Sequence, residues 1–113
     1  MADDPVISNP ELYSVVMENE RVRVLEYRDR PGDRTAPHGH PDSVMITLSA
    51  FRRRLVQGDR QADVELEAGT VRWLDAQEHA GENVGESETR SFFVELKEPH
   101  SGPTESRLGP TEE

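Results

Sequence analysis

The sequence predicts a single all-β domain, and three observations support this. Short runs of β-branched and aromatic residues recur along the chain, turn residues separate them at short intervals, and helix-period patterns are scarce. Many short strands at regular spacing are typical of a sandwich or a barrel. The length of 113 residues fits one domain with a thin core, and no internal repeat or second domain is evident.

The strands are predicted where apolar and polar residues alternate or where an apolar run is bounded by turns. In residues 21–28, for example, valines alternate with charged residues, as in a half-buried strand. The predicted strands are 21–28, 43–48, 51–56, 62–67, 70–74 and 89–97. The predicted turns are Pro31-Gly32-Asp33, Gly58-Asp59, Ala68-Gly69, Ala80-Gly81 and Val84-Gly85.

Both ends of the chain hold little that is expected to pack. Residues 98–113 are rich in Pro, Gly, Ser, Thr and Glu, a composition that cannot offset its own ordering entropy. We therefore expect a flexible segment over residues 1–10, a barrel over residues 11–97 and a flexible acidic tail over residues 98–113.

The composition argues against several classes of protein. A formal net charge of -10 repels phosphate backbones and anionic membranes, so we expect no nucleic-acid partner and no membrane partner. The sequence has no apolar run long enough to span a bilayer and no secretory signal pattern. Without cysteine it has no disulfide framework and no thiolate metal site. These absences favour a cytoplasmic location.

Three of the four histidines are spaced as metal ligands would be, while His100 falls in the tail. His38 and His40 form an H-x-H pair, and on a strand residues i and i+2 point to the same face. Two such imidazoles can converge on one ion, with His79 as a third ligand from elsewhere in the fold. Because prolines and Gly39 surround the pair, a polar loop without metal is the alternative.

The chain resembles the cupins, whose two short motifs flank the metal site of a double-stranded β-helix barrel. Gly32, His38 and His40 have the spacing of the first motif. In the second, the opening Gly69, the histidine at His79 and the asparagine at Asn83 are kept, with one residue fewer before the histidine. The start and end of the barrel region also resemble small bacterial single-domain cupins. The resemblance implies a single jelly-roll-like cupin barrel that holds a divalent transition metal.

The chain departs from the family pattern where the metal-binding glutamate should lie. That position falls at Val44 or Met45, and neither can replace a carboxylate. The remaining set of three histidines resembles the site of some cupin dioxygenases, including those that act on thiols or diketones. It favours iron(II), and zinc, nickel or manganese also suit it. Asp42, two residues after His40, is a candidate substitute for the glutamate.

Two predicted strands contain arginines, and alternation alone does not decide which of them face the barrel interior. Either Arg53 faces the interior, or Arg52 and Arg54 do. An inward arginine needs an anionic partner, either a substrate carboxylate or a protein carboxylate such as Glu95. Arg72 poses the same question, so we name Arg53 and Arg72 as candidate substrate-binding residues.

Two roles are open for Asn83. As in cupins, it can support the site or its loop by hydrogen bonding, or it can be a polar turn residue.

We carry two functions forward from the sequence. In the first, His38, His40 and His79 hold a metal that serves a non-haem iron oxygenase acting on a small anionic metabolite. In the second, the barrel is a non-catalytic module that binds a small ligand or senses a metal. A barrel with vestigial ligands and no metal is a third reading. Small cupins often pair through an N-terminal strand, so a homodimer that exchanges residues 12–17 is expected.

Overall fold

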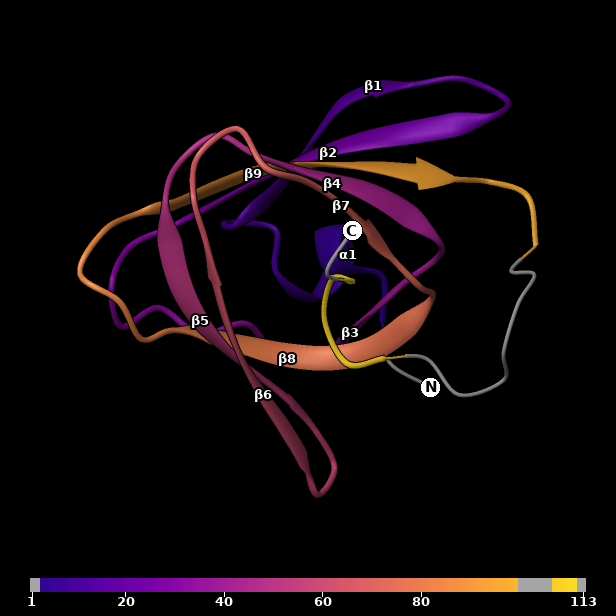
Figure 1. Ribbon diagram of the computed structural model, residues 1–113. Helices are drawn as coiled ribbons and strands as arrows, with labels where there is room; N and C mark the ends of the chain where they lie inside the picture. The colour runs from indigo at the N-terminus through magenta and orange to yellow at the C-terminus, as the bar shows by residue number, and fades with distance from the viewer. Residues whose placement is uncertain (1–2, 100–106, 112–113) are drawn as a thin grey trace.

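The structure is a computed structural model that describes residues 3–99 and 107–111. Within these ranges the chain forms one short helix and a series of strands that close into a barrel (Figure 1). In chain order the elements are α1 (Pro5–Ser8), β1 (Tyr13–Glu18), β2 (Val22–Asp29), β3 (His38–His40), β4 (Ser43–Thr47), β5 (Phe51–Gln57), β6 (Arg60–Leu66), β7 (Val71–Leu74), β8 (Gln77–Asn83) and β9 (Thr89–Leu96).

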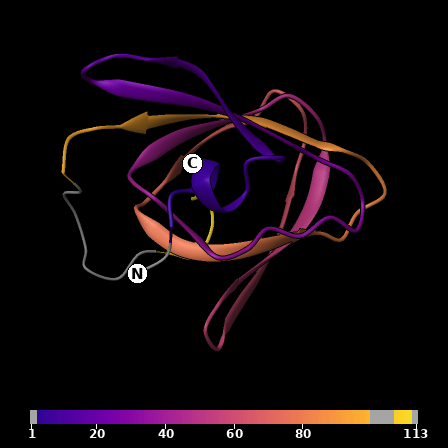
Figure 2. The same cartoon turned by 180° about the vertical axis from the view of Figure 1, so that it is seen from behind.

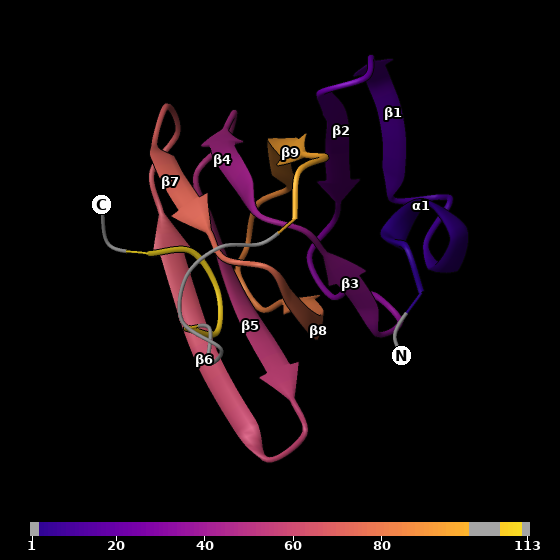
Figure 3. The same cartoon turned by 90° about the vertical axis from the view of Figure 1, so that its right-hand side faces the viewer.

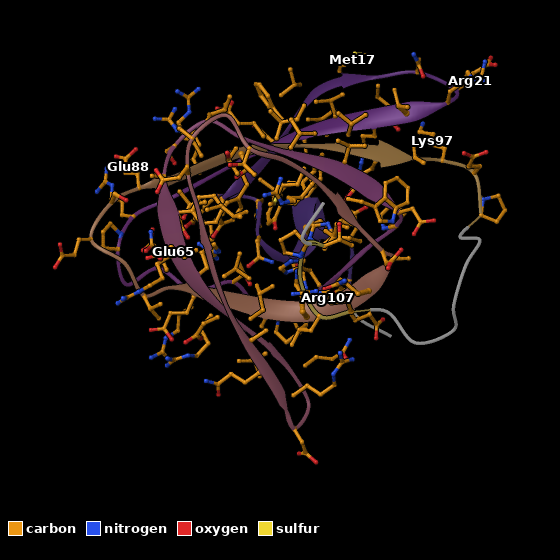
Figure 4. All side chains as sticks on the ribbon, in the orientation of Figure 1. Met17, Arg21, Glu65, Glu88, Lys97 and Arg107 are labelled. Carbon is orange, nitrogen blue, oxygen red and sulfur yellow. The ribbon has the colours of Figure 1, made fainter. Side chains whose placement is uncertain are left out.

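The strands form two sheets that face each other across the interior. One sheet has the order β1-β2-β9-β4-β7 and the other the order β3-β8-β5-β6. All strand pairs within the two sheets are antiparallel. The hairpin of β1 and β2 extends beyond the body of the barrel, and Met17 and Arg21 lie at its far end (Figure 4). This arrangement is the double-stranded β-helix that the sequence predicts.

Inward-facing side chains of the larger sheet supply most of the core. Leu25, Met45 and Phe93 lie on three neighbouring strands and are buried together with Phe51 of the other sheet. Alternation explains this set, because every second residue of a strand faces the same side. In β9, for example, Phe93 is buried while its neighbours Phe92 and Val94 are only half-buried.

The six strands expected from the sequence are all present, with ends shifted by at most two residues. The turns predicted around Gly32, Gly58 and Gly69 are also confirmed, and each of these glycines has a positive φ. Only glycine adopts that conformation at no steric cost, which is why these turns could be predicted. The predicted turn at Ala80-Gly81 is wrong, because both residues lie inside β8.

Gly81 is required by packing rather than by a turn. A Cβ atom at this position would lie 2.9 Å from Nη2 of Arg53 and 3.2 Å from Cδ2 of Leu55. Both contacts are shorter than normal van der Waals separation, so no larger residue fits here without displacing Arg53. The glycine leaves room for the side chains of Arg53 and Leu55, which come from the neighbouring strand β5.

Some of the few N-terminal residues that can pack do lie against the barrel. Pro5 and Asn9 are buried, and the backbone NH of Gly39 donates to the carbonyl of Asp3 at 2.8 Å. Asp4 caps α1 by accepting from the NH of Val6 at 2.9 Å. The helix lies across one end of the barrel (Figure 2).

The described part of the tail, residues 107–111, covers the opposite end of the barrel (Figure 3). Leu108 is buried, and the NH of Thr111 donates to the carbonyl of Trp73 at 2.8 Å. Gly109, with a φ of 88°, passes so close to Leu55 that a Cβ would lie 2.9 Å from its Cδ1. Although residues 98–113 hold little that could pack, Leu108 and these main-chain hydrogen bonds are enough to seat residues 107–111 on the barrel.

Among the described residues, no helix is long and apolar enough to cross a membrane.

Candidate metal centre

The three histidines meet inside the barrel. His38 and His79 are directly opposite each other in the antiparallel pair of β3 and β8, and His40 follows two residues later on the same face. One ring nitrogen from each lies within 4.8 Å of the others, and all three residues are buried. The H-x-H spacing therefore has the consequence predicted from strand geometry.

Each histidine is held by a hydrogen bond at Nδ1, so its other ring nitrogen, Nε2, is the one that faces the site. Nδ1 of His38 donates to the carbonyl of Ala36 at 2.9 Å, and Nδ1 of His79 donates to Oε1 of Gln77 at 2.8 Å. Since these oxygens only accept, the proton of each neutral ring is on Nδ1 and the lone pair is on Nε2. This is the arrangement by which supporting groups orient histidine ligands for a metal.

A carboxylate plays the same part for His40. Oε2 of Glu95 accepts from Nδ1 of His40 at 3.3 Å, and Oε1 of Glu95 accepts two hydrogen bonds from Arg23 at 2.8 and 2.9 Å. The Glu95 side chain is 2% exposed, so the pair is shielded from water. A buried carboxylate behind a histidine raises its basicity as a ligand.

Gln77 fixes His79 because its own amide is held from all sides. Its Nε2 donates to the carbonyls of Asp75 and Arg107 at 2.9 and 2.8 Å. Its Oε1 accepts from His79 and also from the NH of Gly109 at 2.8 Å. The same side chain thus orients one histidine and anchors residues 107–111 over the barrel end.

Burial keeps two of the imidazoles neutral. Desolvation, reinforced by the neighbouring His40, lowers the pKa of His38 from 6.5 to about 4. For the same reasons the pKa of His79 lies well below its usual value. Metal ligation requires the neutral ring, so the barrel prepares these side chains for an ion at neutral pH.

This pKa shift predicts that the metal-free protein loses stability in mild acid. The folded pKa of His38 is about 4 and its unfolded value about 6.5, so the unfolded chain binds more protons between these values. The stabilisation is complete above the unfolded pKa and is lost as the pH falls through this window. Integrating this one shift, we expect the free energy of unfolding to drop by about 2 kcal/mol from pH 7 to pH 5. Urea denaturation of metal-free protein at the two pH values measures this. An equal pH dependence in His38→Gln would contradict the assignment to His38.

A small cavity of about 50 Å³ adjoins the histidines. Tyr13, His38, Met45, His79, Ser91 and Pro110 are among the residues that line it. Space of this size holds a few water molecules and is far below the usual volume of a drug-sized ligand site. Met45 stands where the family glutamate was expected, so the cavity wall offers a thioether in place of a carboxylate.

The Tyr13 hydroxyl lies beside the Nε2 atoms of His38 and His40. The sequence did not suggest Tyr13 for the site. Its hydroxyl donates to Nε2 of His38 at 3.3 Å and lies 3.5 Å from Nε2 of His40. Burial raises the pKa of the Tyr13 hydroxyl, so in this metal-free arrangement it stays protonated. The sequence placed this residue in a strand for exchange between protomers, whereas here it points into its own barrel.

Arg53 faces the interior, and its partner is a protein carboxylate. Its Nη1 contacts Oδ2 of Asp29 at 2.5 Å and Oγ1 of Thr89 at 3.1 Å, while Nη2 donates to the Tyr27 hydroxyl at 3.0 Å. Asp29 and Thr89 belong to the facing sheet, so this cluster joins the two sheets. The partner is Asp29 rather than Glu95, the carboxylate named from the sequence, since Glu95 is bound to Arg23 and His40.

Arg72 lies apart from the histidine site. Its guanidinium donates to the carbonyl of Val71 in an exposed position at 3.0 Å, and it does not line the cavity. The structure therefore brings Arg53, and not Arg72, to the wall beside the histidines.

Asn83 and Asp42 are both buried, with roles in the framework. Nδ2 of Asn83 donates to Oδ1 of Asp29 at 3.0 Å and to the carbonyl of Ser87 at 2.8 Å, so it supports the loop after β8 and the Arg53 cluster. Oδ1 of Asp42 accepts from the NH of Ala76 at 2.8 Å. Asp42 is not in the group that could hold an ion, which among the described residues consists of the three histidines. His100 lies outside the described residues.

Glu95 and Gln77 support the site but were not singled out for it. For Glu95 the signal was a charged residue on the same alternating face as Phe93, which needs a buried partner. For Gln77 the signal was its position two residues before His79, on the same face if the segment is a strand.

Comparison with known proteins gives matches among solved structures only. No family model matches the chain, and no curated protein matches it. A cupin-domain protein from Bordetella pertussis Tohama I is 27% identical with a TM-score of 0.71, covering 77% of this chain and 93% of that one. A double-stranded β-helix protein from Klebsiella pneumoniae is 22% identical with a TM-score of 0.61, covering 88% and 80% of the two chains.

A more distant RmlC-like cupin from Methanocaldococcus jannaschii, 14% identical, matches the fold with a TM-score of 0.61 over 79% of this chain and 80% of that one. The same fold is indicated by the two facing antiparallel sheets, by the inward histidines at the motif positions and by these structural neighbours. The chain has the cupin fold, its structural neighbours are cupin-domain proteins, and its barrel contains a group of three histidines that suits a divalent metal ion.

Proposed function

We propose that the protein is a non-haem iron(II) dioxygenase that acts on a small anionic metabolite, with His38, His40 and His79 as the metal ligands. The observation that supports this most is the orientation of the rings. Each Nδ1 donates to a fixed acceptor, so three Nε2 lone pairs face one space. Iron(II) is favoured because imidazole suits it and an incomplete ligand set leaves room for reactants.

The charge of the donor set supports an anionic substrate. Three neutral imidazoles leave a divalent ion with its full charge, whereas a carboxylate ligand would cancel part of it. Arg53 already has Asp29 as its counter-ion, so a substrate carboxylate is expected to bind on the metal side of the cavity. When bound, iron(II) would supply the redox chemistry that dioxygen needs, and both oxygen atoms would enter the product without an external reductant.

The chain's own residues limit what the site can accept. A cavity of about 50 Å³ admits only a small molecule beside the histidines, unless residues 107–111 move. Its wall includes Ser91, whose buried hydroxyl has no hydrogen-bond partner among the described residues. That hydroxyl is available to a polar group of the substrate.

Oxygen consumption tests the proposal. Protein loaded anaerobically with iron(II) is mixed with aerated buffer and a panel of small carboxylic acids, thiols and diketones. We expect uptake with at least one member, and none with His79→Ala treated in the same way. Absence of uptake across the whole panel by protein that carries iron would overturn the oxygenase function.

The covered barrel end favours a second candidate, a non-catalytic module that binds a small ligand or senses a metal. Residues 107–111 lie over the site and are anchored by Gln77. In that case one member of the panel binds tightly, measured by calorimetry, without oxygen uptake.

We also propose that the protein is a homodimer that pairs through β1. This edge strand exposes Val15, Val16 and Met17, with Val16 53% exposed, although it pairs with β2 of its own chain. An apolar edge strand is a ready site for pairing with a second copy. Light scattering is expected to show a dimer for the native chain and a monomer for Val16→Lys, and a native monomer would contradict this.

A further inference from the structure

The histidine site lacks the carboxylate expected beside it, and a phenol oxygen lies next to the histidines instead. Met45, at the expected position of the glutamate, lines the cavity with a side chain that is a poor ligand for iron. Tyr13 comes from a different strand and a different part of the sequence, yet its hydroxyl reaches two of the three Nε2 atoms.

The distances suit a shared ion. Ligand atoms bound to one ion at about 2.0–2.1 Å and at tetrahedral angles lie roughly 3.3–3.4 Å from one another. The Tyr13 oxygen lies 3.3 Å from Nε2 of His38 and 3.5 Å from Nε2 of His40. Both distances are close to this separation, so the hydroxyl that donates to His38 in the metal-free protein already stands at the distance expected between two ligand atoms of one ion.

The framework that orients His38 also positions Tyr13. The Asn9 side chain accepts from the NH of Ala36 at 2.7 Å and donates to its carbonyl at 3.2 Å, and that carbonyl holds Nδ1 of His38. The NH of Tyr13 donates to the carbonyl of Asn9 at 3.1 Å. Asn9 therefore ties the start of β1 to the segment that leads into β3.

Packing leaves the Tyr13 ring little freedom. The residue is buried, and its ring centroid lies 4.7 Å from that of Tyr27 and 5.4 Å from that of His38. The hydroxyl of Tyr27, in contrast, is held by Asp29 and Arg53. Tyr13 and Tyr27 are the two tyrosines of the chain, so a phenol ligand can come only from Tyr13.

We propose that the phenol oxygen of Tyr13 is the fourth protein ligand of the ion held by His38, His40 and His79. This inference rests on the metal site of the proposed function, with the Tyr13 oxygen in place of the missing carboxylate ligand. A phenolate would cancel one charge of iron(II) and leave one net positive charge, which still attracts an anionic substrate. On ligation the phenol oxygen forms the bond to the ion and releases its proton to the solvent. A phenolate ligand stabilises the oxidised form of iron, so the site would hold iron(III) as well as iron(II).

Visible absorption tests this separately from activity. The full chain is loaded with iron(II), oxidised with ferricyanide, desalted and analysed for metal, and a second sample is loaded with copper(II). Phenolate bound to iron(III) or copper(II) gives an intense charge-transfer band that imidazole ligands do not give. We expect the band in the native protein and in Tyr27→Phe, and its loss in Tyr13→Phe, which keeps the aromatic packing.

Metal content distinguishes the two ways in which the idea can fail. Bound iron or copper without a phenolate band in the native protein would overturn the role of Tyr13 and leave the three-histidine site in place. A band that persists in Tyr13→Phe would do the same. Native protein that binds neither metal would overturn the metal site itself, and the inference with it.

Discussion

Replacement of Arg53 with methionine is expected to lower the free energy of unfolding by about 3–5 kcal/mol, the usual cost of breaking a buried ion pair on one side. Asp29 is 4% exposed, and without Arg53 its charge would face the barrel interior unbalanced. Tyr27 and Asn83 would still donate to Asp29, but neither carries a charge. Urea denaturation of metal-free protein at pH 7 measures the loss.

Arg54 offers a matched control on the same strand. It pairs with Asp63 at 2.9 Å, but the two side chains are 41% and 57% exposed. Exposed pairs contribute little, so Arg54→Met should lower the free energy of unfolding far less than Arg53→Met does. The double variant Arg53→Met with Asp29→Leu should recover much of the loss because it removes both charges. If Arg53→Met and Arg54→Met lowered the free energy of unfolding equally, the buried pair would stabilise the fold no more than the exposed pair does.

The second large effect is expected on metal binding. His38→Ala, which removes one of three ligands, should leave less than about a tenth of an equivalent of bound metal after reconstitution and desalting. Elemental analysis of protein loaded with iron(II) or zinc provides the measurement. His100→Ala serves as the matched control, since it removes the remaining histidine of the sequence, and it is expected to bind as the native protein does.

A graded result is expected from the residue behind His40. In Glu95→Gln the amide no longer carries the charge that faces Nδ1, and loss of such support typically lowers metal affinity about 10–100-fold. The variant should therefore bind metal more weakly than the native protein but more tightly than His38→Ala. If all three bound metal equally, the histidines would not be the ligands.

The sequence predicted the parts of this structure that depend on local patterns. Alternation or short apolar runs identified six strands, glycines in polar segments marked three turns, and the resemblance to the cupin motifs placed His38, His40 and His79 at one site. The strand and turn signals lie within a few residues of the features they predict, whereas the grouping of His79 with the distant His38 and His40 depended on the resemblance to the cupin motifs.

What the sequence could not supply depends on contacts between distant segments. Alternation allowed either Arg53 or its neighbours to face inward, and only the position of Asp29 on the facing sheet decides it. Likewise, Ala80-Gly81 has the composition of a turn. The glycine inside a strand is explained only by the Arg53 side chain, which occupies the space that a Cβ at position 81 would need. Neither contact leaves a signal in the adjacent sequence.

The tail and Tyr13 escaped prediction for a related reason. Average composition correctly describes residues 98–113 as poor in apolar groups, but Leu108 is buried at the barrel end, where Gln77 holds the backbone on both sides of it. Tyr13 fell in residues 12–17, which the cupin resemblance suggested as a strand for exchange between protomers, and nothing in the sequence indicated that this strand begins beside the histidines.

The close approach of Gly81 to Arg53 has a consequence for how this sequence can drift. A Cβ at position 81 would lie 2.9 Å from Nη2 of Arg53. A larger residue at position 81 is therefore tolerated only after Arg53 has been replaced by a shorter side chain. Shortening Arg53 in turn exposes the charge of Asp29 to the interior. Neutralising Asp29 alone would likewise leave the buried Arg53 without its counter-ion, so Asp29 and Arg53 are expected to change together, and Gly81 can be enlarged only after them.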